Sequence, residues 1–342
     1  MSSHPLDRAP ASPPAEVGKR GRIAVVDGLA GDADLFQPLA ERFDVVFHDG
    51  VPRDKAELVA RAQGAEVVLT QALQARFTAA VLRELAGTRL VVTRNAGYDN
   101  IDVEAASACG ICVAHVPGGS GPAVAELVFA GLLALLRHIR QADADVRRGL
   151  WNHEPYFGTE LWGKTMGVVG LGFVGRHVAR IAQGFGMRVL AWSRRPRSQL
   201  ARSLGIEEVS LDQLLAQADV VSLHVALTPG TRHLLDARRL ALMRPGAILV
   251  NTARGLLVDE EALYRELASG RLGGAVLDVL AQEPPAPDHP LLALDNVVLT
   301  PHVGWYTRET LRRQVDEVIR IIDDFYAGRA RHILNPHVMQ RG

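Results

Sequence analysis

The chain has 342 residues, of which 48% are hydrophobic and 22% charged, an ordinary composition for a soluble globular protein. Its 38 basic and 38 acidic residues cancel, so charge gives no reason to expect nucleic acid or an anionic membrane as a partner. The length favours two domains over a single small core.

Residues 1–21 are rich in Pro, Ala and Ser and predict a disordered tail. The tail lacks the apolar core of a signal peptide. No stretch of the chain approaches the roughly 20 apolar residues of a membrane span. The sequence therefore predicts a cytoplasmic protein without a membrane partner.

From residue 22 on, short apolar runs alternate with amphipathic stretches, which predicts parallel sheets covered by helices on both faces. The first series of predicted strands is Ile23–Val26, Val45–Phe47, Val67–Leu69, Leu90–Thr93 and Cys112–Ala114, with helical patterns at Asp54–Gln63 and Thr78–Leu85. The second series is Met166–Val169, Arg188–Ala191, Val220–Leu223, Ala247–Asn251, Gly274–Leu277 and Val297–Leu299. The fold class is thus α/β, with two doubly wound parallel-sheet domains.

The chain contains two cysteines, Cys109 and Cys112, and they form a CxxC. Cys109 ends a predicted helix, whereas a redox CxxC lies at a helix N-terminus, where the dipole lowers the thiol pKa. A redox or zinc role is therefore the less favoured interpretation, and no metal site is predicted.

The breaker-rich run 117–122 predicts a hinge. A long helix over Ala123–Arg147 follows it, and a final amphipathic helix over Thr307–Ala327 is expected to pack back onto the first domain. The second domain would therefore be inserted in a discontinuous first domain.

The run from Gly170 to Gly175 has the form of a dinucleotide-binding turn, GxGxxG. Gly170 permits the tight turn, Gly172 lets the backbone approach a pyrophosphate, and Gly175 lets the helix pack against the strand. The first helical residues, Phe173 and Val174, would then direct their amides at the phosphates.

The end of the next predicted strand indicates which dinucleotide binds. An NAD enzyme usually carries Asp or Glu there, which accepts hydrogen bonds from the ribose hydroxyls. This chain has Ser193, Arg194 and Arg195 instead. The loss of the acidic residue and the gain of two arginines both favour binding of a 2′-phosphate. NADP is therefore the preferred cofactor, and NAD remains possible.

Three residues that follow later strands indicate the reaction. Arg254 can clamp a carboxylate with its bidentate fork, and His302 suits proton transfer near neutral pH, with Glu283 holding its imidazole in one tautomer. Each alone has an ordinary interpretation, as a surface ion-pair residue, a capping or core histidine, or a solvated carboxylate. Together, at the ends of strands in a nucleotide-binding sheet, they indicate hydride transfer to a 2-keto acid.

From about residue 22 to residue 335 the chain resembles the D-isomer-specific 2-hydroxyacid dehydrogenases. The motifs that carry the resemblance are Arg94–Asp102, Val124–Glu126, the GxGxxG turn, Leu223-His224, Asn251–Gly255, Asp278–Pro284 and Thr300–His302. The resemblance implies an NAD(P)-binding Rossmann domain over residues 122–304. It also implies a flavodoxin-like substrate domain made of residues 22–121 and 305–342, with the active site in the cleft between them.

The resemblance also implies roles for individual residues. Arg254 would bind the substrate's carboxylate and keto oxygen, and His302, partnered by Glu283, would be the general acid in reduction and the base in oxidation. Asp278 would hold the nicotinamide carboxamide. The substrate carboxylate would meet the backbone around Ala96 and Gly97, and further cofactor contacts would come from His224, Thr252, Ala253 and Gly304.

Family members are usually homodimers, which points to Ala123–Arg147 and the arm Trp151–Gly158 as the interface. The chain departs from the family pattern at Ser193-Arg194-Arg195, as the NADP-using glyoxylate/hydroxypyruvate reductases do. Ala226 replaces a usual Pro and Gly121 a common Thr. Trp305 replaces a small residue and either lines the substrate pocket or packs at the domain crossing.

The sequence therefore predicts an NADPH-preferring reductase of small 2-keto acids, with glyoxylate and hydroxypyruvate as the leading substrates and D-2-hydroxy acids as products. One alternative is a non-catalytic, dinucleotide-sensing protein like the corepressors of this family. Another is an NAD-dependent D-2-hydroxyacid or phosphite dehydrogenase. The phosphite version is weakened because Ala96 stands where those enzymes carry a lysine.

Overall fold

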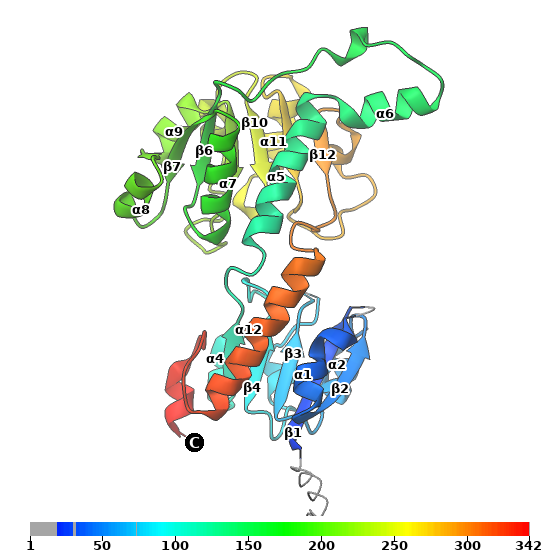
Figure 1. Ribbon diagram of the computed structural model, residues 1–342, viewed down its shortest axis with the longest axis vertical. Helices are drawn as coiled ribbons and strands as arrows, with labels where there is room; N and C mark the ends of the chain where they lie inside the picture. The colour runs from blue at the N-terminus through cyan, green and yellow to red at the C-terminus, as the bar shows by residue number, and fades with distance from the viewer. Residues whose placement is uncertain (1–18, 30–31, 73, 342) are drawn as a thin grey trace, which may run out of the picture. The chain divides into compact units, whose positions relative to one another are not determined.

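The computed structural model describes residues 19–29, 32–72 and 74–341, and these divide into two compact units (Figure 1). The first unit holds the described residues up to Arg94, then Tyr98–His115 and those from Glu317 on. The second holds Asn95–Gly97 and Val116–Asp316. The main segment of the second unit thus lies in sequence between parts of the first. The predicted insertion, with its limits at residues 122 and 304, stays a prediction.

The first unit is built on a five-stranded parallel sheet in the order β2-β1-β3-β4-β5, the flavodoxin-like doubly wound order. Its strands are β1 (Arg20–Gly28), β2 (Phe43–Asp49), β3 (Val67–Thr70), β4 (Leu90–Thr93) and β5 (Cys112–His115), and its helices include α1 (Gln37–Ala40), α2 (Lys55–Ala62), α3 (Ala79–Leu82) and α4 (Val103–Ala108). Strand β1 begins inside the tail predicted for residues 1–21, so Arg20 and Gly21 correct that limit, and residues 1–18 lie outside the described part.

The last helix, α12 (Arg308–Tyr326), contributes its second half to the first unit. The ring of Tyr326 lies 5.5 Å from that of Phe43, and its hydroxyl donates to Glu66 at 2.8 Å. These contacts tie the C-terminal part of the helix to the edge strand β2 and to the residue before β3.

The second unit is built on a seven-stranded parallel sheet in the order β12-β11-β10-β9-β6-β7-β8. Its strands are β6 (Thr165–Val169), β7 (Arg188–Trp192), β8 (Glu207–Glu208), β9 (Val220–Leu223), β10 (Ile248–Asn251), β11 (Gly274–Leu277) and β12 (Val297–Leu299). Its helices are α5 (Gly121–Leu136), α6 (Ile139–Arg147), α7 (Phe173–Gly184), α8 (Ser198–Ser203), α9 (Leu211–Gln217), α10 (Ala237–Leu242) and α11 (Glu260–Ala268). The two-sheet α/β fold expected from the sequence is confirmed.

Helices cover both faces of this sheet, as the near-continuous apolar strands require. Helices α5 and α7 pack on one face, where Figure 1 shows them side by side, and α9, α10 and α11 pack on the other. Each face has its own apolar cluster, because successive strand residues such as Val168 and Val169 point to opposite sides. The C-terminal strand ends, which carry the predicted site residues, meet at one edge.

The single helix predicted over Ala123–Arg147 is wrong. The chain breaks at Arg137 and His138, where His138 has a left-handed φ of 53°, and α5 and α6 bend by 61°. Helix α5 buries much of its length against the sheet, whereas α6 buries none of its residues. No single helix in the described ranges is long and apolar enough to span a membrane.

The CxxC lies where the sequence places it. Cys109 is the C-cap of α4 and exposed, Cys112 opens β5 and is buried, and both are free thiols. Burial raises the pKa of the Cys112 thiol, the opposite of an activated cysteine. Residues 19–29, 32–72 and 74–341 contain no cluster of side chains suited to a metal ion.

Candidate active site

The glycine turn between β6 and α7 is built on two close backbone approaches. Gly170 has a φ of 108°, and a Cβ there would lie 2.7 Å from the carbonyl oxygen of His224. A Cβ on Gly175 would lie 1.9 Å from the carbonyl oxygen of Gly170. Only glycine fits either position, so α7 starts directly against the end of the strand.

The start of α7 fits a dinucleotide. Its N-cap is Gly172, so no side chain caps the first amides, and a Cβ there would find its nearest neighbour 4.0 Å away. The amides of Phe173 and Val174 are thus left without a side-chain cap in the positive field of the helix N-terminus, which suits a pyrophosphate. In the described part of the chain, the buried hydroxyl of Thr252 also has no hydrogen-bond partner.

The side chain of Phe173 serves the hinge, not the phosphates. A Cβ on Gly118, whose φ is 83°, would lie 2.7 Å from its ring, and the guanidinium of Arg176 lies 5.0 Å from the ring centre. Gly121 packs less tightly, since a Cβ there would lie 3.1 Å from His177 and 3.2 Å from the Phe173 carbonyl oxygen. A threonine at position 121 would need these neighbours to shift slightly.

The Ser193-Arg194-Arg195 segment borders the glycine turn. The hydroxyl of Ser193 accepts the Leu171 N–H at 3.1 Å, and Arg194 donates to the hydroxyl of Thr228 at 3.4 Å. Arg195 is exposed. Two arginine side chains thus follow the strand end where a ribose would be recognised.

His224, after β9, is held as a neutral imidazole. Its backbone N–H donates to the carbonyl of Val169 at 2.8 Å, and its ring Nε2 lies 2.8 Å from the hydroxyl of Ser222. Burial lowers the pKa of His224 to about 3, so it carries no charge near neutral pH. It can offer a hydrogen bond to a cofactor but no charge.

The structure pairs the two residues expected to move the proton. Nδ1 of His302 lies 2.7 Å from Oε2 of Glu283. Burial by itself would raise the pKa of Glu283, but the hydrogen bond and charge of His302, with the Leu280 amide and the charge of Arg254, lower it below its usual value. Glu283 is therefore ionised, so Nδ1 carries the proton of this hydrogen bond. Nε2, to which no described residue is hydrogen-bonded, is left for the substrate.

Asp278 holds the His302 segment in place. Its Oδ1 accepts the Thr300 hydroxyl at 2.5 Å and the Val303 N–H at 2.8 Å, and its Oδ2 accepts the Gly304 N–H at 2.9 Å. Its backbone carbonyl accepts the His302 N–H at 2.9 Å. Held by these hydrogen bonds, His302 adopts a left-handed φ of 55°. The predicted contact of Asp278 with the nicotinamide stays a prediction.

The Arg254 segment lies against the Glu283 segment through a glycine. The side chain of Asn251 accepts the Ala253 N–H at 3.1 Å and donates to the Arg254 carbonyl at 2.9 Å. At Gly255 a Cβ would lie 2.0 Å from the Leu280 carbonyl carbon. The Arg254 and Glu283 segments are thus in contact through Gly255, and Glu283 is hydrogen-bonded to His302. Their common role as one catalytic site stays a prediction.

A family model described as "D-isomer specific 2-hydroxyacid dehydrogenase, NAD binding domain" matches residues 129–304, or 176 of the 342 residues. The chain belongs to this family. It is thereby an NAD(P)-dependent oxidoreductase, as the sequence predicts. The resemblance noted in the sequence is confirmed.

Three curated relatives show the range of the family near this chain. It is 40% identical over 306 residues to a hydroxypyruvate reductase of Thermotoga maritima, covering 89% of this chain and 97% of that protein. It is 39% identical over 295 residues to a glyoxylate reductase of Korarchaeum cryptofilum, covering 85% and 89%. It is also 39% identical over 307 residues to a D-3-phosphoglycerate dehydrogenase of Methanocaldococcus jannaschii, covering 87% of this chain but 57% of that longer protein.

Among solved structures, an acyclic imino acid reductase in complex with NADPH and D-Arg superposes with a TM-score of 0.82 at 31% identity. The match covers 92% of this chain and 99% of that one. The two-domain dehydrogenase fold therefore extends over nearly the whole chain.

Two predicted substrate contacts lie outside the catalytic triad. Ala96 and Gly97 belong, by their contacts, to the second unit, where the Asn95 carbonyl accepts the Val116 N–H at 3.0 Å. Trp305 is half-buried and packs edge-on against Tyr306 at 5.2 Å. The roles of all three toward the substrate stay predictions.

Three residues that hold the segments of Arg254, Glu283 and His302 were not predicted from the sequence. Asn251 and Thr300 do so near strand ends, and Glu260 does so from the first turn of α11. A polar residue at the end of an apolar strand is a usable signal for the first two. Glu260 carries none, because it resembles any acidic residue of a first helical turn.

Proposed function

We propose that this dehydrogenase is an NADPH-preferring reductase of small 2-keto acids, with glyoxylate and hydroxypyruvate as its leading substrates. The observation that carries the activity is the 2.7 Å hydrogen bond between His302 and Glu283, in a unit that also holds Arg254 and an uncapped dinucleotide turn. The relatives named glyoxylate reductase and hydroxypyruvate reductase support the choice of substrate.

The residues divide the reaction between them. A bound nicotinamide supplies the hydride. Arg254 binds the substrate carboxylate with its planar fork and so fixes the keto carbon in place. Glu283 keeps the proton on Nδ1 of His302, and Nε2 of the imidazolium gives its proton to the keto oxygen during reduction. Asp278 keeps the His302 segment in the geometry this transfer needs.

Cofactor preference follows from Ser193, Arg194 and Arg195. Without a carboxylate at this strand end, nothing there repels a 2′-phosphate, and two guanidinium groups can bind it. Replacing Arg194 and Arg195 by Ala should lower kcat/KM for NADPH and leave that for NADH nearly unchanged. Arg202→Ala, an exposed arginine of α8, is the control. A wild-type preference for NADH would refute the assignment.

Turnover of a panel of 2-keto acids with NADPH tests the activity itself. We expect glyoxylate and hydroxypyruvate to give the highest kcat/KM of the panel, because the group attached to their keto carbon is small. If no member of the panel is reduced while NADPH still binds, the non-catalytic sensing role replaces the proposal.

We also propose that the protein is a homodimer joined through α6 and the arm that follows it. The arm exposes large apolar side chains, with Trp151 89% and Phe157 94% exposed, and on α6 Ile139 is 54% exposed. Figure 1 shows α6 and the arm extending away from the sheet of their own unit. Isolated domains seldom leave such groups in water, and a second copy would bury them.

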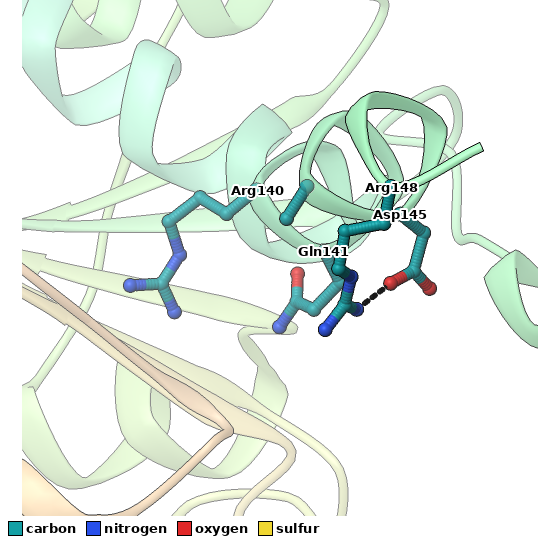
Figure 2. Close-up of a pocket in the computed structure, with 5 residues that line it drawn as sticks. Arg140, Gln141, Asp145 and Arg148 are labelled. Atoms are coloured by element: carbon teal, nitrogen blue, oxygen red, sulfur yellow. Dashed lines mark hydrogen bonds and ion pairs between the residues drawn. The ribbon is translucent and has the colours of Figure 1, made fainter. Parts of the chain in front are cut away.

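Polar contacts hold this surface in shape. Arg140 donates to the Val297 carbonyl at 3.1 Å, which anchors α6 to β12, and Asp145 binds Arg148 and the Tyr156 hydroxyl of the arm. Figure 2 shows Arg140, Gln141, Asp145 and Arg148 around a hollow on α6. These contacts fix the surface of α6 and the arm within one subunit, and a surface fixed in this way suits a permanent interface.

Light scattering after size exclusion tests the dimer. Trp151→Glu combined with Phe157→Glu should convert a dimer to a monomer. Val51→Glu, at an exposed valine of the first unit, should leave it dimeric. A monomeric wild type would contradict the proposal.

A further inference from the structure

The segment that carries Glu283 has few attachments. Residues 281–284, which follow β11, are exposed, and the side chain of Glu283 is 32% exposed. One attachment lies within the segment, where Oε1 of Glu283 accepts the Leu280 N–H at 3.2 Å. A catalytic carboxylate on so exposed a segment needs an anchor in the body of the domain.

That anchor comes from helix α11. Oε1 of Glu260, in the first turn of the helix, accepts the N–H of Ala281 at 2.7 Å. Ala281 lies two residues before Glu283, and the peptide between Leu280 and Ala281 is also in close contact with Gly255. Helix α11 is thus linked to His302 in three steps. Glu260 accepts the Ala281 N–H, the backbone leads from Ala281 to Glu283, and Glu283 is hydrogen-bonded to His302.

Glu260 is itself held by a histidine. Its Oε2 lies 3.3 Å from Nε2 of His289, and these two side chains are 17% and 19% exposed, less than either Glu283 or His302. Nδ1 of His289 is buried, and none of the described residues is hydrogen-bonded to it. Glu260 and His289 therefore form a second carboxylate–imidazole pair, which is joined to the Glu283 segment through the Ala281 amide.

We propose that Glu260, oriented by His289, is a positioning residue that holds the Ala281 amide and thereby sets the Glu283 carboxylate against Nδ1 of His302. The inference rests on the proposed function for its kinetic consequence alone, since the Glu283–His302 hydrogen bond is observable without turnover. In metal sites, loss of a residue that orients a ligand costs roughly 10–100-fold in affinity or activity, and we expect the same range for this carboxylate.

Steady-state reduction of glyoxylate with NADPH tests the kinetic part. Glu260→Ala should lower kcat by roughly 10–100-fold while the Kd for NADPH stays within about twofold, because the glycine turn lies elsewhere. Glu260→Gln should restore most of kcat, since its amide oxygen still accepts the Ala281 N–H. Glu261→Ala, at the neighbouring 82% exposed carboxylate, should leave kcat unchanged. An unchanged kcat in Glu260→Ala, or an equal loss in Glu260→Gln, would overturn the proposal.

A double-mutant cycle separates positioning from a general loss of structure. If Glu260 acts through Glu283, Glu260→Ala should lower kcat no further in a Glu283→Ala background. Equal losses in both backgrounds would overturn the proposal. Should Glu260→Ala fail to fold, His289→Gln takes its place in the same cycle, with a smaller expected loss and the same criterion.

The Nδ1–H proton of His302 gives a readout independent of activity. In the proton NMR spectrum this resonance, assigned by its disappearance in His302→Asn, should be present in the wild type and shifted or exchange-broadened in Glu260→Ala. If it persists unchanged in Glu260→Ala, the proposal fails whatever the enzyme reduces. If it responds but no 2-keto acid is turned over, the positioning role holds and the proposed function fails.

Discussion

Gly255→Ala tests whether the approach of two backbone segments sets the catalytic geometry. The added Cβ would lie 2.0 Å from the Leu280 carbonyl carbon and 2.2 Å from its oxygen, whereas ordinary contacts begin at 3.4 Å. The segments must therefore separate by about 1.4 Å, the difference between 3.4 and 2.0 Å. Arg254 stands on one segment and Glu283 on the other. Because a misplacement of about 1 Å can cost roughly 10²-fold in rate, we expect kcat to fall by about that factor.

The assay is reduction of the best 2-keto acid with saturating NADPH, together with the Kd for NADPH and thermal unfolding. The Kd for NADPH should rise far less than kcat falls, because α7 and its glycine turn are untouched and only the predicted contacts of Thr252 and Ala253 lie on the displaced segment. Overpacking should cost about 1–3 kcal/mol of stability. Gly184→Ala is the matched control, since a Cβ there would meet nothing within 4 Å. A folded Gly255→Ala enzyme with kcat within about threefold of wild type would refute the reasoning.

Three further outcomes are expected. His302→Ala should lower kcat by roughly 10²–10⁴-fold, the usual contribution of a general acid, and leave NADPH binding intact; turnover near the wild-type rate would remove its assigned role. Arg254→Ala should abolish use of 2-keto acids more than it weakens cofactor binding, which kcat/KM and the Kd for NADPH measure separately. For His224, whose pKa of about 3 lies below the ordinary 6.5, the unfolded chain takes up a proton that the folded one does not. Stability should therefore fall as the pH drops from about 6.5 toward about 3, by up to about 1.4 kcal/mol per pH unit, and urea unfolding of His224→Gln should show a shallower fall.

Much of the candidate site can be predicted from the sequence, because parallel strands that are buried on both faces have sequences made of short apolar runs. Where each run ends, the chain emerges at the same edge of the sheet. Arg254 and Glu283, which are 29 positions apart, are therefore expected to lie on neighbouring segments, and the close approach of Gly255 to the Leu280 carbonyl shows that these segments touch. The glycine turn can also be predicted from the sequence, because the local backbone geometry requires glycine at each of its three characteristic positions.

Some elements carried no such signal. Strand β8 is two acidic residues, Glu207 and Glu208, at a sheet edge, where neither burial nor alternation marks a strand. The break at His138 lies in a run without Gly or Pro. It separates a helix that packs on the sheet from one that does not, so tertiary packing and not propensity ends α5 there.

The sequence by itself determined the two-sheet α/β class and predicted the dinucleotide turn and the candidate catalytic set, because these depend on local periodicity and on residues next to strand ends. The tertiary structure alone decided what holds that set in register: Asp278 around the His302 segment, Gly255 against Leu280, and Glu260 on the Ala281 amide. Each of these joins segments about 20 residues or more apart. Their chemistry is that of any buried carboxylate or close glycine, so only the folded chain shows which atoms meet.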